Sequence, residues 1–387
     1  MNNIANYLSK LVRAQLYEEE IPLLPEDISV EEVIRISRTN HMDYLLLGAM
    51  LKGKIDEKYV PVLRQYVLSS TLLTLTQVNE LKKLLAEFEE KGIVNQPMKG
   101  SVMKFMYPTP EMREMSDIDI LIREEDMEKA AQVLRENGYE LEQAIKHHDI
   151  YRKKPFMVIE AHRALYDKTV DKAQYEYFKD ISKRELREGC KYTYDFSKEE
   201  FYVYMMAHMA KHFYKMGCGI RNIVDVYIYN ERFGQMLNRQ YVEQELEKCG
   251  ILTFTRHMEK LAQIWLGEEE STEFYDHVFD YMLNSGIYGK DENGIWNKFA
   301  EENQKEGKVS RLRLKFWYFF PPLAYMEEYY PWLEEKPYLL PWAWCVRAYG
   351  GIFKKKGVHK REMMNDISDE QVNVYRTIYQ NMGLHFR

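Results

Sequence analysis

The sequence predicts an α+β fold that is mainly helical, with a small mixed β-sheet between a helical N-terminal segment and a helical C-terminal domain. Three observations predict it. Apolar residues recur at helical spacing from residue 4 to about residue 90. From residue 92 to about residue 165, strand-like runs alternate with helices, and from residue 166 the pattern is helical again. We therefore expect three units, at residues 1–91, 92–170 and 171–387.

The N-terminal segment carries three helix signals. Apolar residues recur every three or four positions from Ile4 to Leu16. Ser29 and Glu32 form a capping-box pattern ahead of the next apolar run. Pro61 begins a long periodic stretch that continues to Phe88. We expect this last helix to brace the sheet domain and to take no part in chemistry.

The central unit carries two aspartates in a predicted strand. The run from Asp117 to Ile122 alternates polar and apolar residues, which is typical of a half-buried strand. Asp117 and Asp119 lie two residues apart, so both carboxylates are expected on one face. Adjacent carboxylates repel each other, and a divalent cation is their usual partner. Because ligation by carboxylates alone suits Mg²⁺ or Mn²⁺, the pair predicts a site for one of these ions.

A Gly-Ser pair precedes the aspartates. Gly100-Ser101 follows a short predicted strand around Ile93 and opens a helix predicted from Val102 to Tyr107. Such a turn leaves backbone N–H groups free to hold an anion, most often a phosphate. A phosphate cradle beside metal-binding carboxylates is suited to phosphoryl or nucleotidyl transfer.

The rest of the central unit completes a small sheet. A helix is predicted from Glu124 to Asn137, with Gly138 as the residue that ends it. Two strand-like runs follow, near His148–Arg152 and Phe156–His162. Alternating strands and helices over so short a span predict helices packed on a sheet.

Composition narrows the classes of function. The formal charge is −7, from 54 basic and 61 acidic residues, and no long basic run occurs, so a nucleic-acid partner is not expected. The four cysteines are widely spaced without a CxxC pair, so neither a zinc site nor a disulfide framework is indicated. No signal peptide or uncharged apolar run of roughly 18 residues is found, so a cytoplasmic protein without a membrane span is expected.

Gly100-Ser101 followed by Asp117-x-Asp119 in an apolar strand resembles the signature of the polymerase-β-like nucleotidyltransferase superfamily. The wider string from Met98 to Ile122 looks like one branch of it, the uncharacterised bacterial and archaeal nucleotidyltransferase family with a helical C-terminal half. The resemblance covers about residues 93–163 and extends more weakly through the C-terminal helices. It implies that the small sheet is a nucleotidyltransferase core.

The resemblance also implies a third carboxylate on a later strand, where Glu160 matches. In this hypothesis Asp117 and Asp119 hold two metal ions, and Glu160 holds the catalytic one and could accept the proton of the acceptor hydroxyl. His162 lies two residues after Glu160 on the same strand face. It could orient a carboxylate, contact the acceptor, or be a hydrogen-bonded structural histidine.

On the same resemblance, the candidate nucleotide-binding residues are Lys99, Gly100, Ser101, Arg113, Ser116, His208, His212 and Arg221. Lys99 could pair with a phosphate or cap the end of the strand. Ser101 could bond a phosphate oxygen, cap the helix, or do both. Arg113 could reach the triphosphate with its planar fork, but an ion pair with Glu111 or Glu114 is slightly favoured.

Two histidines lie on the C-terminal side of the predicted cleft. His208 and His212 share one face of a helix predicted over residues 201–216. The residue after His208 is methionine, so the zinc-protease motif is excluded. The resemblance favours cleft-lining for this pair, and the alternative is an internal polar network with Arg221 and Asp225.

The C-terminal domain is unusually aromatic. From Phe316 to Phe353 the sequence is dense in aromatic residues and proline, and three lysines at 354–356 close it. Core packing of a helical domain is the favoured interpretation, and a membrane-surface patch is the alternative.

The expected reaction is Mg²⁺-dependent transfer of AMP from ATP to a hydroxyl or phosphate of a small-molecule acceptor, with release of pyrophosphate. The base and the acceptor are not read from the residues. Protein nucleotidylation, a catalytically silent nucleotide-binding module that acts through a partner, and a phosphotransferase that releases ADP are the alternatives. The sequence makes no prediction about the oligomeric state.

Overall fold

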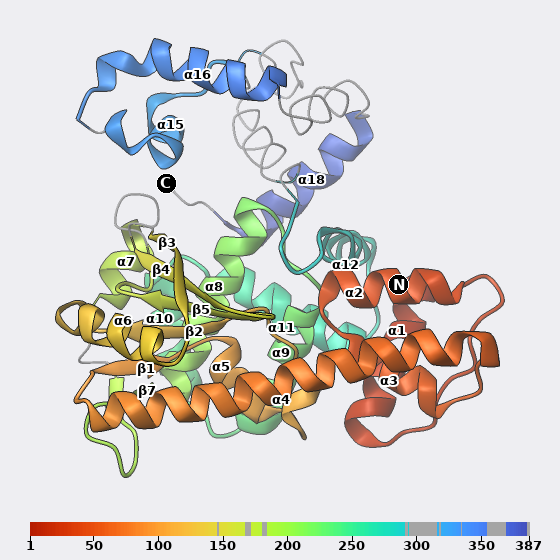
Figure 1. Cartoon of the computed structure of the whole chain (residues 1–387). Coiled ribbons are helices and arrows are strands. Elements are labelled where there is room, and N and C mark those ends of the chain that lie inside the picture. Colours follow the sequence, from red (N-terminus) through yellow and green to blue (C-terminus); the bar gives the residue numbers. More distant parts are fainter. Residues whose placement is uncertain are drawn as a thin grey trace.

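A five-stranded mixed sheet and one long helix beside it organise the fold, which is the mainly helical α+β arrangement that the sequence predicts (Figure 1). The structure, a computed structural model, describes residues 1–144, 147–166, 172–179, 184–290, 293, 316, 319–333, 335–353 and 369–384. The long helix is α4 (Val60–Glu90), with the sheet near one end and the N-terminal helices near the other (Figure 1).

Two of the N-terminal helices form where their own signals predict them, and they are α1 (Asn3–Tyr17) and α2 (Val30–Asn40). A third helix, α3 (Asp43–Lys52), follows in the region that was expected to be helical, without a specific signal of its own. Ser29 caps α2, because its Oγ accepts a hydrogen bond from the backbone N–H of Glu32 at 3.1 Å. Midway along α4, the buried Gln77 donates from Nε2 to the carbonyl oxygen of Met115 at 3.0 Å. The helix therefore holds the loop in front of Asp117.

The sheet has the strand order β1-β2-β5-β4-β3. The strands are β1 (Asn95–Pro97), β2 (Ile118–Ile122), β3 (Glu140–Ala144), β4 (His148–Lys153) and β5 (Met157–His162). β2 and β5 run parallel, with Asp119 opposite Glu160, and the other neighbours pair antiparallel. The sequence does not predict β3, because all its residues are exposed and it lacks an apolar face that would produce alternation.

Both faces of the sheet are covered. The isoleucines of β2 pack against α6 (Met127–Glu136) and the end of α4, and they are Ile118, Ile120 and Ile122. The opposite face, which carries Asp119 and Leu121, lies next to Tyr204 of α8 (Lys198–Lys215). Every residue of β2 is buried, so the prediction of a half-buried strand is wrong. Its polar positions face a second layer of protein rather than solvent.

In the described parts of the chain, the remaining elements are helices and a two-stranded ribbon. The ribbon pairs β6 (Arg184–Leu186) with β7 (Tyr194–Phe196). The α-helices are α5 (Gly100–Met103), α7 (Lys172–Phe178), α9 (Arg221–Phe233), α10 (Arg239–Lys248), α11 (Leu252–Leu266), α12 (Glu273–Ser285), α15 (Leu323–Tyr329), α16 (Leu340–Phe353) and α18 (Asp369–Met382). α8 begins three residues earlier than predicted because Ser197 caps it, with Oγ accepting from the N–H of Glu200 at 3.2 Å.

The largest apolar core joins helices from both ends of the chain. Ala5 and Leu8 of α1 belong to the same buried cluster as Phe213 of α8 and Phe254 of α11. Trp265 of α11 donates from Nε1 to the carbonyl oxygen of Ala5 at 2.9 Å. The N-terminal helices therefore pack directly on the C-terminal ones, and the borders of the three units stay a prediction.

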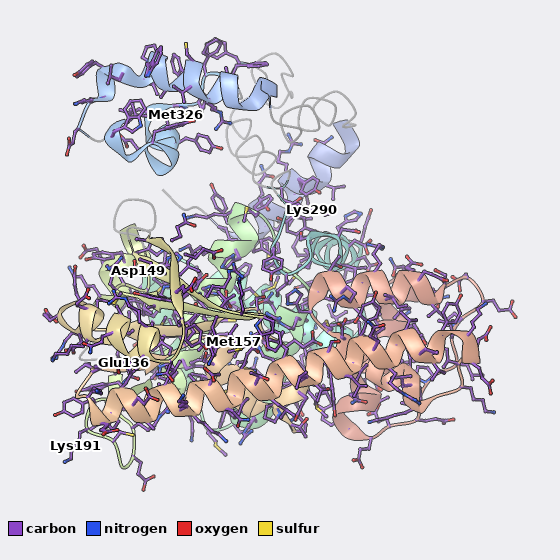
Figure 2. The ribbon with its side chains drawn as sticks, viewed as in Figure 1. Glu136, Asp149, Met157, Lys191, Lys290 and Met326 are labelled. Carbon is purple, nitrogen blue, oxygen red and sulfur yellow. The ribbon has the colours of Figure 1, made fainter. Side chains whose placement is uncertain are left out.

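The aromatic region near the C-terminus forms a small layer of its own. Met326, Leu333 and Ala343 make its core, and Figure 2 shows Met326 away from the main body. Tyr338 and Trp342 are exposed, so aromatic side chains here are found both in a core and at the surface. The lysines at 354–356 lie outside the described residues. Among the helices that the structure describes, none combines the length and apolar composition needed to cross a membrane.

Candidate active site

Three carboxylates meet on one face of the sheet. The parallel register sets Asp119 of β2 directly opposite Glu160 of β5. Asp117 lies in the bend just before β2, close enough for the carboxylates of Asp119 and Glu160 to raise its pKa. Asp119 is buried at 4% exposure, whereas Asp117 and Glu160 are half-buried. The two strands therefore bring together the three carboxylates that the sequence predicts.

Lys99 and His162 do not fully offset the repulsion among the three carboxylates. Burial, and then repulsion from Asp119 and Glu160, raise the pKa of Asp117 to about 7. Asp119 behaves in the opposite way: although burial opposes it, Lys99 and His162 hold its pKa far below the ordinary value. His162 likewise lowers the pKa of Glu160 against the effect of burial. A cluster of oxygen donors in which one member is driven to bind a proton at neutral pH suits a divalent cation.

Lys99 pairs with a carboxylate, a contact that neither of its two suggested roles, phosphate binding and capping of the strand end, includes. Its Nζ donates to Oδ1 of Asp119 at 2.7 Å, and little of either side chain is exposed. The backbone at Lys99 has φ 46° and ψ −120°, a conformation that costs a residue with a Cβ about 1–2 kcal/mol. This turn directs the ammonium group back onto β2.

Gly100 and Ser101 begin α5, two residues before the predicted helix start. Ser101 does not cap this helix, and its buried Oγ has no hydrogen-bond partner among the described residues. A Cβ at Gly100 would overlap Nη1 of Arg113 and lie 3.1 Å from the Cβ of Met115. The glycine is therefore needed for close packing of this turn on Arg113.

Arg113 forms a buried ion pair that the sequence does not predict. Its Nη2 lies 2.9 Å from Oδ2 of Asp225 on α9, and its Nε lies 3.2 Å from Oδ1. The hydroxyl of Tyr107 donates to Oδ1 of Asp225 at 2.8 Å. The predicted ion pair with Glu111 or Glu114 is wrong, because the planar fork of Arg113 is committed to Asp225. The side chain thus ties the loop before β2 to α9.

Two more buried cations lie beside Arg113. Arg221 donates from Nη1 to the carbonyl oxygen of Glu114 at 2.8 Å, and burial and then Arg113 lower its pKa to about 10. Among the described residues no hydrogen bond joins it to Asp225, so the alternative of a polar network of Arg221 and Asp225 is realised with Arg113 in the place of Arg221. Lys104 is fully buried, and its Nζ has no partner among the described residues. Burial, and then repulsion from Arg113 and Arg221, lower the pKa of Lys104 to about 7.

His162 bridges two of the carboxylates. Its Nε2 lies 2.8 Å from Oδ1 of Asp119 and 3.3 Å from Oε2 of Glu160. Its ring stacks on that of His148 with centroids 4.9 Å apart. Of the roles considered from the sequence, orientation of a carboxylate is thus the one with an observed contact. His148 was not singled out from the sequence, and its position becomes apparent only when β4 is paired with β5, which sets it opposite His162.

The histidines of α8 contact each other. Nε2 of His208 and Nε2 of His212 lie 3.1 Å apart, so one donates to the other. Burial, and then Lys99, lower the pKa of His212 to about 3, and the same causes lower the pKa of His208. Both rings are therefore neutral at pH 7, and no hydrogen bond joins them to Arg221 or Asp225 in the part of the chain that the structure describes. Their proximity to Lys99 brings α8 to the carboxylate face.

Ser116 has two partners from outside the sheet. Its Oγ accepts a hydrogen bond from the hydroxyl of Tyr288 at 2.7 Å and lies 3.4 Å from Nδ1 of His41. Burial, and then Arg221, lower the pKa of His41 to about 4. His41 and Tyr288 are more than 70 residues from Ser116, so no local pattern could have predicted these contacts.

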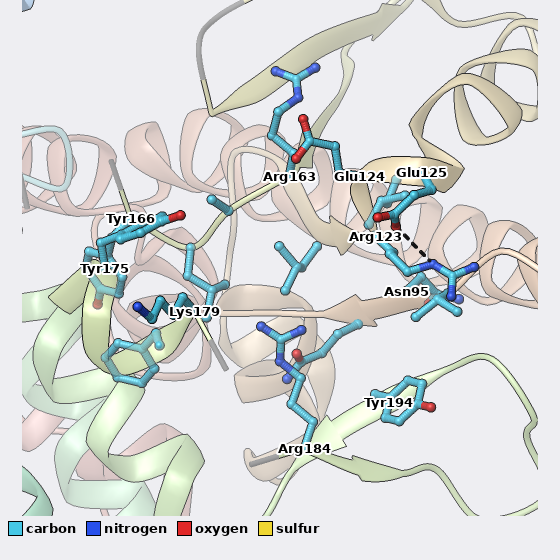
Figure 3. Close-up of a pocket in the computed structure, with 17 residues that line it drawn as sticks. Asn95, Arg123, Glu124, Glu125, Arg163, Tyr166, Tyr175, Lys179, Arg184 and Tyr194 are labelled. Atoms are coloured by element: carbon cyan, nitrogen blue, oxygen red, sulfur yellow. Dashed lines mark ion pairs between the residues drawn. The ribbon is translucent and has the colours of Figure 1, made fainter. Parts of the chain in front are cut away.

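A cavity of about 200 Å³ lies farther along β1 and β2, and none of the three carboxylates lines it (Figure 3). Gln96 and Leu121 line it, and they pair in register on β1 and β2. Because Leu121 is two residues after Asp119, the cavity continues along the same face of the sheet. Figure 3 shows Arg163 and Arg184 among its lining side chains. Gln96 is 1% exposed, and both polar atoms of its amide lack a partner among the described residues.

Comparison with known proteins gives one match. A family model described as an uncharacterised nucleotidyltransferase matches residues 26–267, which is more than half of the chain. The matched range contains the three carboxylates, Lys99 and the histidines of β4, β5 and α8. No curated protein and no solved structure gives a significant match.

Proposed function

The chain belongs to this family of uncharacterised nucleotidyltransferases, and from that premise we propose that it transfers a nucleoside monophosphate, AMP from ATP, to a hydroxyl or phosphate of a small-molecule acceptor and releases pyrophosphate. One observation carries the proposal. The parallel register of β2 and β5 sets Asp119 beside Glu160, with Asp117 in the bend just before β2. This is the arrangement expected of the polymerase-β-like superfamily.

The donor set fits a hard divalent cation. Asp117, Asp119 and Glu160 offer only carboxylate oxygens, which Mg²⁺ and Mn²⁺ prefer. The raised pKa of Asp117 has repulsion from the other two carboxylates among its causes, and a cation bound there would remove that repulsion. Such an ion would hold the triphosphate and neutralise charge that develops on its oxygens.

The chain's own residues have separate tasks in this proposal. Glu160 is ionised at neutral pH, since His162 lowers its pKa, so a carboxylate oxygen can accept the proton of the acceptor hydroxyl. The acceptor oxygen bonds to the α-phosphorus, and the bond to the pyrophosphate oxygen breaks. Lys99 holds Asp119 in position and adds positive charge beside the leaving phosphates.

The nucleotide-binding roles proposed from the sequence are revised by these contacts. Four residues stay candidates for binding the triphosphate: Lys99, Gly100, Ser101 and Ser116. The first three form the turn that begins α5. Arg113 becomes a positioning residue, because Asp225 takes its fork. His208, His212 and Arg221 would line the cleft from the helical side.

The cavity beside the sheet is the proposed seat of the acceptor. It begins at Leu121, two residues beyond Asp119, and its lining carries both arginines, such as Arg163 and Arg184, and the glutamates at 124 and 125. The unpartnered amide of Gln96 could hydrogen-bond a hydroxyl group there. These features favour a small polar acceptor.

A pyrophosphate-release assay with ATP and Mg²⁺ across candidate acceptors tests the proposal. Asp119→Ala should abolish release, whereas Asp56→Asn, a change at an exposed aspartate far from the sheet, should leave it unchanged. Unchanged turnover in Asp119→Ala would reject the role of the carboxylates. Appearance of ADP in place of pyrophosphate would indicate a phosphotransferase, and nucleotide binding without turnover on any acceptor, proteins included, would favour a silent module.

A further inference from the structure

Two histidines and a glutamate converge beside the proposed catalytic carboxylates. His162 and Glu160 lie two residues apart on β5, so they share a face of the sheet. His148 of β4 is directly opposite His162 in the antiparallel register. Asp119 of β2 is opposite Glu160 on the other side. Three neighbouring strands therefore place two imidazoles and two carboxylates at adjoining positions.

The three side chains are also close enough together to hold a metal ion. Nε2 of His162 lies 3.3 Å from Oε2 of Glu160, and Nε2 of His148 lies 3.9 Å from the same oxygen. One ligand atom from each of these three residues lies within 4.8 Å of the other two. Ligand atoms bound at about 2.1 Å around a tetrahedral or octahedral ion are separated by about 3.0–3.5 Å. Small side-chain movements would bring the three atoms to that spacing.

His148 has no other evident role. Its side chain is 12% exposed, and its Nδ1 is buried without a hydrogen-bond partner among the described residues. The distance from its Nε2 to Glu160 exceeds that of a hydrogen bond. A stacked contact with His162 sets the orientation of its ring. A largely buried imidazole whose Nε2 lies 3.9 Å from a carboxylate oxygen, without a hydrogen bond to it, is close enough to become a ligand beside that oxygen.

We propose that His148, Glu160 and His162 bind a divalent ion of the first transition series, with Zn²⁺ as the expected species, next to the hard-metal position of Asp117 and Asp119. Two imidazole nitrogens favour such an ion over Mg²⁺ or Ca²⁺. Oδ1 of Asp119 lies 2.8 Å from Nε2 of His162, but it also accepts a hydrogen bond from Lys99 at 2.7 Å, so the proposed protein ligands are the three residues alone. The site would then contain one hard and one softer metal position that meet at Glu160.

Any role of this metal ion in catalysis rests on the proposed function. Binding of the ion itself does not, because it is measured without nucleotide. The full chain is stripped with a chelator and then titrated with Zn²⁺ in equilibrium dialysis and with Co²⁺ by visible absorbance. We expect wild type to bind Co²⁺ with a ligand-field spectrum. His148→Gln should bind at least about tenfold more weakly, a loss seen even for outer-shell partners of a metal. His277→Gln, a change at a histidine outside the ligand set, should retain the spectrum.

A second variant keeps the proposal falsifiable if His148→Gln unfolds. In His148→Cys the Co²⁺ complex should gain a thiolate-to-cobalt charge-transfer band that wild type lacks, since residue 148 would coordinate the ion directly. Far-ultraviolet circular dichroism checks folding of each variant. Wild type that binds neither ion, His148→Gln that binds like wild type, or a folded His148→Cys without the band would each overturn the proposal. A failure of pyrophosphate release with Mg²⁺ would leave these spectra unaffected, so the two proposals can fail separately.

Discussion

Replacing Lys99 by methionine should destabilise the protein in a pH-dependent manner. The ammonium group lies 2.7 Å from Oδ1 of Asp119, and their side chains are 23% and 5% exposed. Removing one partner of a buried ion pair costs about 3–5 kcal/mol. Lys99 is partly solvated and His162 stays on Asp119, so we expect a loss of about 2–3 kcal/mol in the free energy of unfolding at pH 7.

The pH dependence follows from the sign of the shift. Although burial opposes them, Lys99 and His162 depress the pKa of Asp119 in the folded protein. The stability that this carboxylate contributes is therefore complete above its unfolded pKa of about 4, and it is lost as the pH falls toward the folded value. In Lys99→Met the folded pKa of Asp119 rises. The difference between the two proteins should be full at neutral pH and should narrow below about pH 4.

Urea denaturation of wild type and Lys99→Met at several pH values measures this difference. Lys91→Met, a change at an exposed lysine at the end of α4, is the matched control and should stay within about 0.5 kcal/mol of wild type. The reasoning is refuted if Lys99→Met is as stable as wild type at pH 7. It is equally refuted if the difference persists unchanged in acid while Lys91→Met behaves as expected.

Four other changes give further predictions. Lys104→Met should raise the melting temperature, most strongly at or below pH 7; the folded pKa of Lys104 is lowered to about 7, so wild type itself should gain stability as the pH rises from 7 toward 10. Asp225→Asn should cost about 3–5 kcal/mol in urea denaturation, because it leaves the buried Arg113 uncompensated, and a loss below about 1 kcal/mol would contradict the ion pair. Gln96→Leu should stabilise the protein by about 1–3 kcal/mol, because it removes a buried unpaired amide, and should weaken acceptor binding; a destabilised variant would show that the amide has a partner. His212→Ala should weaken ATP binding in calorimetry while the circular dichroism spectrum is retained, and loss of the folded signal would favour a structural role.

The features that the sequence predicts correctly are those that neighbouring residues determine. Alternation identified β2, capping residues identified α2, and the glycine at 138 marked the end of α6. The α+β fold follows from such local patterns, because the spacing of apolar residues within each segment indicates whether it is a helix or a strand. The opposition of Asp119 and Glu160, 41 residues apart, was expected only through the family resemblance.

The features that the sequence does not predict depend on distant pairing. Arg113 and Asp225 are 112 residues apart, and nearby glutamates offered a closer partner by sequence alone. The role of His148 requires the register of β4 on β5, which no single strand contains. Ser116 meets Tyr288 across 172 residues. Side-chain partners of this kind depend on the tertiary structure, so only coordinates identify them.

The continuity of α4 has a mechanical consequence. At about 1.5 Å per residue, its 31 residues form a strut of about 46 Å without an internal joint. One half packs against α3, and the hydrogen bond of Gln77 to Met115 attaches its middle to the loop that leads into Asp117. We expect a displacement of the N-terminal helices, such as docking of another molecule there would cause, to be transmitted along α4 to the loop before Asp117. Two glycines inserted after Thr74 would interrupt that transmission and leave the residues of the catalytic face unchanged.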